Sequence, residues 1–166
     1  MRNISARNKG LITGGLIVLL SAIAYYFNQN FDNGVSIVAY FMYAAGVVWT
    51  LIAYHLKEEG NKNFKDYFQQ GFKCYIVVTL IMVTATWIFL KWNVKMQNEM
   101  IEFQRKQLIE AHNYSEPDIE QQLARYKKLL LPGYTIGAIL SYLGIGTLIT
   151  ILVSAFLSQF KRVQKV

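Results

Sequence analysis

The sequence has little of the chemistry on which most enzymes and metalloproteins depend. Cys74 is the single cysteine, which excludes an internal disulfide and a cysteine pair for metal binding or redox chemistry. The two histidines, His55 and His112, lie far apart in the chain, and no HExxH, GxSxG, Walker or GxGxxG pattern occurs. We therefore predict no catalytic residues, no metal, no cofactor and no enzymatic activity.

Charged residues are also scarce, at 16% of the chain, whereas hydrophobic residues make up 54%. Four long runs contain no Asp, Glu, Lys or Arg, and each reaches the lower limit of about 17 residues for a transmembrane helix. Uncharged spans also argue against an ion-coupled transporter, because such transporters usually carry an ionisable residue inside a span. The sequence predicts an all-α integral membrane bundle, one domain over residues 1–166 with spans at about 10–27, 35–54, 74–91 and 132–158.

The basic residues are distributed unevenly around these spans. Ten of them lie in the two tails and the second loop: Arg2, Arg7, Lys9, Lys57, Lys62, Lys65, Lys73, Lys161, Arg162 and Lys165. These segments hold three acidic residues, whereas the first loop and segment 91–128 together hold seven basic and seven acidic residues. Because Lys and Arg in short loops stay in the cytoplasm, we predict that both termini are cytoplasmic. Basic residues that flank spans predict membrane lipids as partners and no nucleic acid.

The second loop carries aromatic residues at helical spacing, namely Phe64, Tyr67, Phe68 and Phe72. The pattern predicts a short interfacial helix over 63–72, with Asn63 as its N-cap. This helix either lies on the inner membrane surface or packs under the bundle, since both arrangements use the same face.

The connection between the third and fourth spans is long and charged. No Gly or Pro occurs from Phe72 to Glu116, so the third helix is predicted to continue beyond the membrane. Ser115, followed by acidic residues and Pro117, is a suitable N-cap for a return helix. We therefore predict an extracytoplasmic helical hairpin over 92–131 between the third and fourth transmembrane helices, re-entering the membrane at Pro132–Gly133.

Apolar residues on the two arms of this hairpin are spaced so that they can meet across it. A charged hairpin with an apolar stripe is also a suitable recognition surface. The candidate partner-binding residues are Ile101, Leu108, Ile119, Leu123 and Tyr126.

Small residues recur at close intervals in the last span, and Gly10 and Gly14 do so in the first. Such spacing lets helices approach closely, either within one chain or between two copies. The candidate helix-packing residues are Gly133, Gly137, Ser141 and Gly144.

Several polar residues lie in the middle of spans, including Tyr40, Tyr43, Thr79 and Tyr142. They can line a groove between helices, or they can form hydrogen bonds with one another across helices. We expect the second arrangement.

The order of these features resembles a bacterial family of four-span membrane proteins, domain of unknown function 4199. The family's F-x-x-x-F-x-x-G-F segment corresponds to Phe64–Phe72, and its S-E-x-x-I-E segment corresponds to Ser115–Glu120, followed by Lys127–Lys128 and Pro132–Gly133. The resemblance covers nearly the whole chain and implies a multi-pass protein of the bacterial inner membrane. It carries over no catalytic residue. Genes of the family often neighbour a polyprenyl-phosphate-type glycosyltransferase, which implies a link to lipid-linked sugars.

Two functions follow as hypotheses. The leading one is a non-enzymatic inner-membrane protein that serves as an accessory or scaffold subunit of a larger membrane complex. The alternative is a small carrier or flippase for lipid-linked, polyprenyl-type substrates. Both expect membrane lipids and either other membrane proteins or a second copy of the chain as partners.

Overall fold

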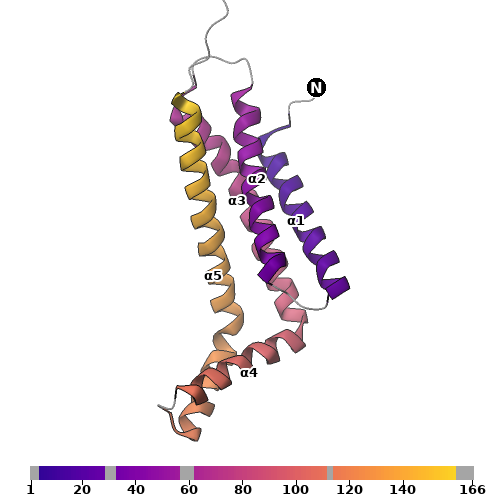
Figure 1. The fold of residues 1–166 in the computed structure, drawn as a ribbon, viewed down its shortest axis with the longest axis vertical. Helices are drawn as coiled ribbons and strands as arrows, with labels where there is room; N and C mark the ends of the chain where they lie inside the picture. Colours follow the sequence, from indigo (N-terminus) through magenta and orange to yellow (C-terminus); the bar gives the residue numbers. More distant parts are fainter. Residues whose placement is uncertain (1–3, 29–32, 57–61, 112–113, 160–166) are drawn as a thin grey trace, which may run out of the picture. The chain divides into compact units, whose positions relative to one another are not determined.

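The computed structural model describes residues 4–28, 33–56, 62–111 and 114–159. These residues form helices and no strand, which confirms the predicted all-α class (Figure 1). The helices are α1 (Ala6–Asn28), α2 (Asn33–His55), α3 (Phe64–Trp92), α4 (Val94–Glu110) and α5 (Glu116–Gln159).

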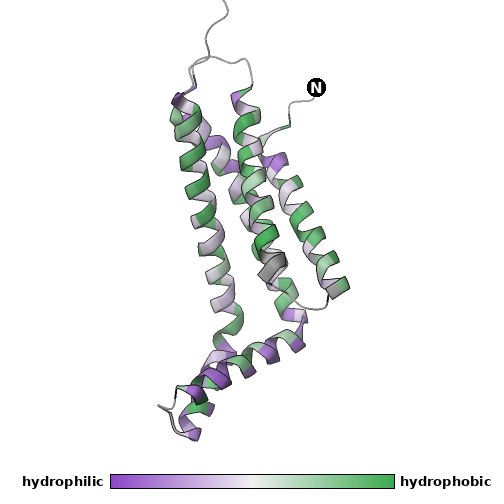
Figure 2. Cartoon of the chain, in the orientation of Figure 1, coloured by the Kyte–Doolittle hydropathy of each residue, from purple (hydrophilic) through white to green (hydrophobic). Residues whose placement is uncertain are grey.

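Four of these helices are long and apolar enough to cross a membrane: the candidate spans are Ala6–Phe27, Ile37–His55, Phe64–Trp92 and Glu116–Gln159. Apolar residues dominate α1, α2 and most of α3, whereas α4 is largely hydrophilic (Figure 2). The chain is therefore a membrane protein with four membrane-like helices, as predicted.

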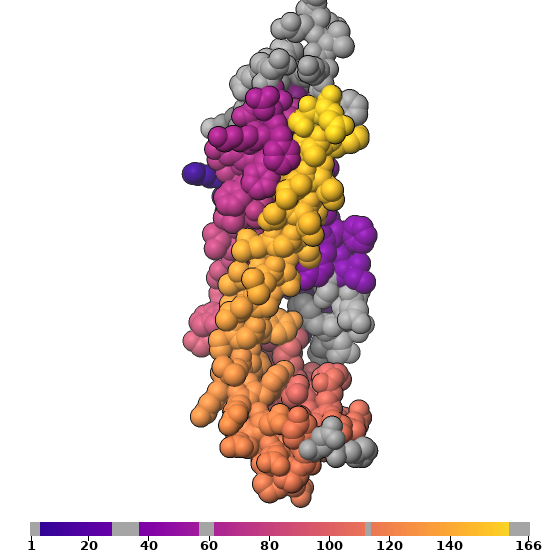
Figure 3. Space-filling view, turned by 90° about the vertical axis from the view of Figure 1, so that its left-hand side faces the viewer, coloured from indigo at the N-terminus to yellow at the C-terminus, as the bar shows by residue number. Residues whose placement is uncertain are grey.

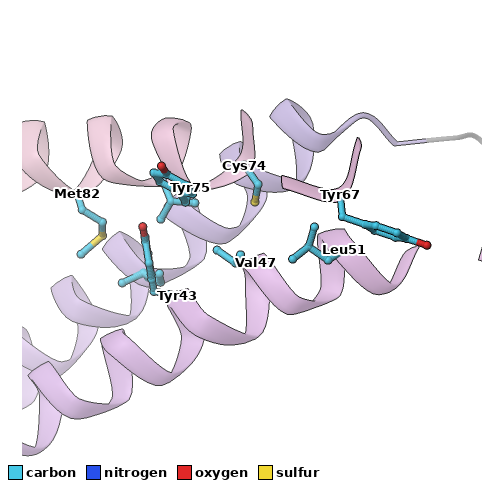
Figure 4. Close-up of a cluster of buried hydrophobic side chains, with 9 residues drawn as sticks. Tyr43, Val47, Leu51, Tyr67, Cys74, Tyr75 and Met82 are labelled. Atoms are coloured by element: carbon cyan, nitrogen blue, oxygen red, sulfur yellow. The ribbon is translucent and has the colours of Figure 1, made fainter. Parts of the chain in front are cut away.

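The chain divides into two compact units, of which the first comprises residues 1–82 and 140–166 and the second residues 83–139. The core of the first unit is a cluster of buried side chains from α1, α2 and α3. Figure 4 shows those of α2 and α3 pointing toward one another, with Tyr43, Val47 and Leu51 on α2 and Cys74, Tyr75 and Met82 on α3.

Helix α3 is one uninterrupted helix where the sequence predicted an interfacial helix and a separate span. It begins beside the predicted N-cap: the Asp66 carboxylate accepts a hydrogen bond from the backbone N–H of Asn63 at 2.9 Å. Three of the predicted aromatic residues stack in a row on one face, with ring centroids 5.9 Å apart for Phe64 and Phe68 and 6.3 Å apart for Phe68 and Phe72. Tyr67 is buried at 3% exposure, whereas Phe64 and Phe72 are exposed.

The third helix does not continue into the hairpin, which corrects the prediction made from the lack of Gly and Pro. It ends at Trp92, and a new helix begins at Val94. The physical reason is Asn93, which leaves helical geometry at φ −92° and ψ 78° while its side-chain oxygen accepts from the backbone N–H of Met96 at 3.1 Å. The Gln97 side chain then donates to the carbonyl oxygen of Leu90 at 2.7 Å. Both ends at the break are thus capped.

The second unit contains the predicted hairpin core. Leu108 on α4 is buried with Ile119 and Leu123 of α5, and Ile101 packs against them. Helix α5 begins after Ser115, as predicted, and the Ser115 hydroxyl donates to the Asp118 carboxylate at 2.5 Å. That the hairpin is extracytoplasmic stays a prediction.

Helix α5 continues through the predicted re-entry point, and Pro132 lies inside a continuous helix of 44 residues. A proline removes one backbone hydrogen bond and strains the preceding turn, but it does not have to end a helix in an apolar environment.

Candidate functional site inside the helix bundle

Close contacts at small residues bring the helices of the first unit together. A Cβ atom added to Gly10 of α1 would lie 2.7 Å from the Cys74 carbonyl oxygen of α3, and one added to Gly14 would lie 2.8 Å from the Ile81 side chain. On α2, a Cβ at Gly46 would collide with the Thr13 side chain of α1. The predicted small face of α1 therefore packs within the chain, with α3 on one side and α2 on the other.

Tyr43 of α2 connects three helices through its hydroxyl group. It is fully buried, and its O–H donates to the backbone carbonyl of Tyr142 on α5 at 2.9 Å. The same oxygen lies 3.4 Å from the Thr79 hydroxyl of α3. Because a phenol has one hydrogen, Thr79 is the donor in this second contact.

Gly146 of α5 leaves room for this arrangement. A Cβ at Gly146 would collide with the Tyr43 hydroxyl and would lie 2.8 Å from the Tyr75 ring. The Tyr75 hydroxyl in turn lies 3.0 Å from the Thr147 hydroxyl, again between α3 and α5. These contacts confirm the expectation that mid-span polar residues, here Tyr43 and Thr79, bond to other helices.

Aromatic contacts extend this network to the surface of the bundle. The Tyr142 ring lies 5.8 Å from the Tyr43 ring and 5.6 Å from the Tyr40 ring. Tyr40 is 36% exposed, so it forms the outer end of a seam between α2 and α5 whose inner end is the buried Tyr43.

A second polar layer lies where α2 ends and α3 begins. His55 Nδ1 lies 2.7 Å from the Tyr67 hydroxyl. Lys62 donates to the Tyr54 carbonyl at 2.6 Å and lies 4.6 Å from the centre of its ring. Cations near carbonyl groups at a helix C-terminus are favourable, so Lys62 stabilises the end of α2.

The interior also contains two hydroxyl groups that no described residue satisfies. Thr150 and Ser154 of α5 are fully buried, and neither side-chain oxygen has a hydrogen-bond partner within the described residues. Sequence reasoning missed this pair. The available signal was the four-residue spacing of Tyr142, Gly146, Thr150 and Ser154, a second small and polar stripe in the last span.

The structure gives the candidate partner-binding residues a structural role. Leu108, Ile119 and Leu123 are at most 8% exposed, and Ile101 packs against them, so they form the core of the hairpin rather than its surface. Tyr126 is half-buried. Partner binding through this set stays a prediction, and the contacts of its apolar residues within the hairpin give them a structural role as well.

The candidate helix-packing stripe lies on the open side of α5. A Cβ at Gly133, Gly137 or Gly144 would meet no described atom within 4 Å, and Ser141 is exposed. Figure 3, which views the chain from the side of α5, shows the C-terminal half of this helix uncovered on that side. The role of this stripe in helix packing, within one chain or between two copies, stays a prediction.

One shallow depression lies at the tip of the hairpin, with a volume of about 550 Å³. Its lining residues are Tyr114, Asp118, Gln121, Gln122 and Arg125. Apart from Tyr114 they share one face of α5, so the depression is an open polar surface. Within the described ranges, no three His, Cys, Asp or Glu side chains come together as metal ligands would.

Comparison with known proteins places the chain in a family without an assigned activity. The profile of the family described as protein of unknown function (DUF4199) matches residues 8–159, and the chain belongs to this family. No curated protein and no solved structure matches the chain. The comparison therefore agrees with the resemblance stated from the sequence and adds no residue roles.

Proposed function

We propose that the protein is a non-enzymatic accessory or scaffold subunit of a larger complex in the bacterial inner membrane, with both termini in the cytoplasm. The observation that carries this proposal is the use of Tyr43, Thr79, Tyr75 and Thr147 in bonds between helices. A substrate path needs polar groups that are free to bind cargo, whereas these groups hold helices together. The bundle is thus suited to anchoring.

The hairpin supplies surface for recognition outside the spans. Helix α4 is largely hydrophilic, yet Phe103 is 63% exposed on it, and its opposite face forms the hairpin core. Exposed aromatic side chains on a polar surface are typical anchors of protein interfaces. A partner in the same membrane complex is therefore expected to contact α4 around Phe103.

The test is purification from native membranes in mild detergent. We expect a second membrane protein to be recovered at fixed stoichiometry and to be lost with Phe103→Asp, while Asn98→Asp on another face of α4 retains it. Recovery of the protein without a partner contradicts the proposal. Equal recovery of the partner with the two variants contradicts it as well. Reporter fusions at both termini and at the hairpin test the orientation, and a hairpin reporter on the cytoplasmic side contradicts it.

A second candidate, a carrier for lipid-linked substrates, is favoured by the surface exposure of Tyr40. The Tyr40 ring is exposed at the lipid-facing surface and contacts the Tyr142 ring, which in turn contacts the buried Tyr43 ring. Native mass spectrometry tests this candidate. A carrier should release bound polyprenyl-phosphate lipid when Tyr40→Ala and Tyr142→Ala are combined, and unchanged lipid content contradicts the carrier role.

A further inference from the structure

Two buried hydroxyl groups in α5 lack hydrogen-bond partners among the described residues, and they lie on one face of the helix. Thr150 and Ser154 are four residues apart, and each side chain is 0% exposed. A hydroxyl group that is buried without a hydrogen bond destabilises a protein by about 1–3 kcal/mol. Two adjacent hydroxyl groups of this kind indicate that a polar molecule forms hydrogen bonds with them in the folded protein.

Other hydroxyl groups in the helices show that bonding to their own backbone is available. Thr50 donates to the Gly46 carbonyl at 2.9 Å, Thr135 to the Leu131 carbonyl at 2.8 Å and Ser158 to the Ala155 carbonyl at 2.9 Å. Ser and Thr side chains in apolar helices commonly adopt this arrangement. Thr150 and Ser154 do not adopt it, so their oxygens are directed toward the interior of the bundle.

The surroundings of Thr150 place its side chain on the face of α5 that packs against α3. A Cβ at Gly71 of α3 would lie 2.5 Å from Thr150 Cγ2 and 2.9 Å from its hydroxyl oxygen. Ser154 lies one turn nearer the end of α5, and Tyr67 lies one turn nearer the start of α3. Figure 1 shows that α3 begins and α5 ends at the same end of the bundle. The hydroxyl pair thus leads toward that end, where the basic residues Lys62 and Lys65 also lie.

We propose that Thr150 and Ser154 bind water inside the bundle and that this water enters at the end where α3 begins and α5 ends. Water both donates and accepts hydrogen bonds, and buried water in proteins typically makes about three of them. Two hydroxyl groups one turn apart supply donors and acceptors of this kind. The inference goes beyond the proposed subunit role, because an anchor requires no interior water.

Cysteine reactivity tests this site directly, because methanethiosulfonate reagents react with the thiolate, which forms in water and not in lipid. The background is Cys74→Ser, and the probe is a quaternary-ammonium methanethiosulfonate applied to open membrane vesicles. The test variant is Ser154→Cys. The matched control is Leu152→Cys, because Leu152 lies at the same depth on α5 and is 68% exposed on the outer side. We expect modification of Ser154→Cys at least about tenfold faster than that of Leu152→Cys. Equal rates would show a dry contact and overturn the proposal.

A second measurement does not depend on the introduced thiol. If Ser154 binds water, Ser154→Ala removes the hydrogen bond between the side chain and that water and lowers the thermal midpoint by about 2–4 °C in detergent. If the hydroxyl group has no partner at all, its removal leaves the midpoint unchanged or raises it, which overturns the proposal. Thr50→Val, which removes a hydroxyl group with a known protein partner, sets the scale of the expected loss.

Discussion

Removing the Tyr43 hydroxyl group tests whether polar bonds hold the helices of the bundle together. Tyr43→Phe keeps the fully buried ring and removes the donor to the Tyr142 carbonyl and the acceptor for Thr79. The Tyr142 carbonyl keeps its bond within α5, and Thr79 can turn to its own backbone, so neither partner is left fully unsatisfied. The loss of stability in Tyr43→Phe therefore equals the contribution of the two hydrogen bonds alone.

The magnitude follows from known hydrogen bonds between membrane helices. Such bonds average about 0.6 kcal/mol and reach about 1.7 kcal/mol. Tyr43 makes one short bond at 2.9 Å and one longer contact at 3.4 Å, so Tyr43→Phe should destabilise the fold by about 1 kcal/mol. For a chain of this size the thermal midpoint should fall by about 2–4 °C. Tyr43→Ala should cost about 3–5 kcal/mol, because it also leaves a cavity.

The assay is thermal or denaturant unfolding in detergent, followed by tryptophan fluorescence. Tyr40→Phe, one turn away on α2 and 36% exposed, is the matched control and should change little. A double-mutant cycle of Tyr43→Phe with Thr79→Val isolates the coupling between the two hydroxyl groups. Equal stability of Tyr43→Phe and Tyr40→Phe would refute the assignment of a structural role to this network.

Three further changes test other parts of the fold. Gly14→Leu should lower the free energy of unfolding by about 1–3 kcal/mol, because a Cβ at Gly14 would lie 2.8 Å from the Ile81 side chain. Gly15→Leu is the control and should change the free energy of unfolding little, because a Cβ at Gly15 would have no atom within 4 Å. Asn93→Ala removes the N-cap of α4 and should lower the free energy of unfolding by about 1 kcal/mol. Amide hydrogen exchange in the first turn of α4 should become faster, and unchanged exchange there would contradict the capping role. Gly137→Leu should leave monomer stability unchanged and reduce self-association measured by energy transfer in bilayers, and unchanged transfer would exclude this face as a contact between copies.

The parts of the fold that depend on overall composition could be predicted from the sequence. The presence of four membrane-like helices follows from long uncharged runs, because the cost of burying charge in lipid is large and acts on every residue of a span. The contact of Leu108 with Ile119 and Leu123 follows from helical periodicity, because a helix outside the apolar spans needs a distinct apolar face to pack. Both signals are spread over many residues.

The helix break between α3 and α4 depends on single residues, and the prediction of a continuous third helix was wrong. Asn93 ends α3 although Asn is not a strong helix breaker, because its side chain caps α4 while Gln97 bonds to the end of α3. Pro132 does not end α5, although proline usually does so. Helix propensity alone cannot decide such cases, because the outcome depends on which side chains satisfy the freed backbone groups.

The two faces of α5 show why the site itself could not be read from the sequence. Gly133, Gly137 and Gly144 form one small stripe, and Gly146, Thr150 and Ser154 form another, with nearly the same spacing. In water the buried stripe would be the more apolar one, but in lipid both the exterior and the core of a bundle are apolar, so hydrophobicity does not distinguish them. The structure places the second stripe against Tyr43, Tyr75 and Gly71 and leaves the first open. The difference lies in the neighbouring helices: α2 and α3 carry hydroxyl groups and a glycine at the depths where the second stripe meets them. Helix pairing in this bundle is therefore set by the match of small and polar residues between helices, a property of pairs that no single span contains.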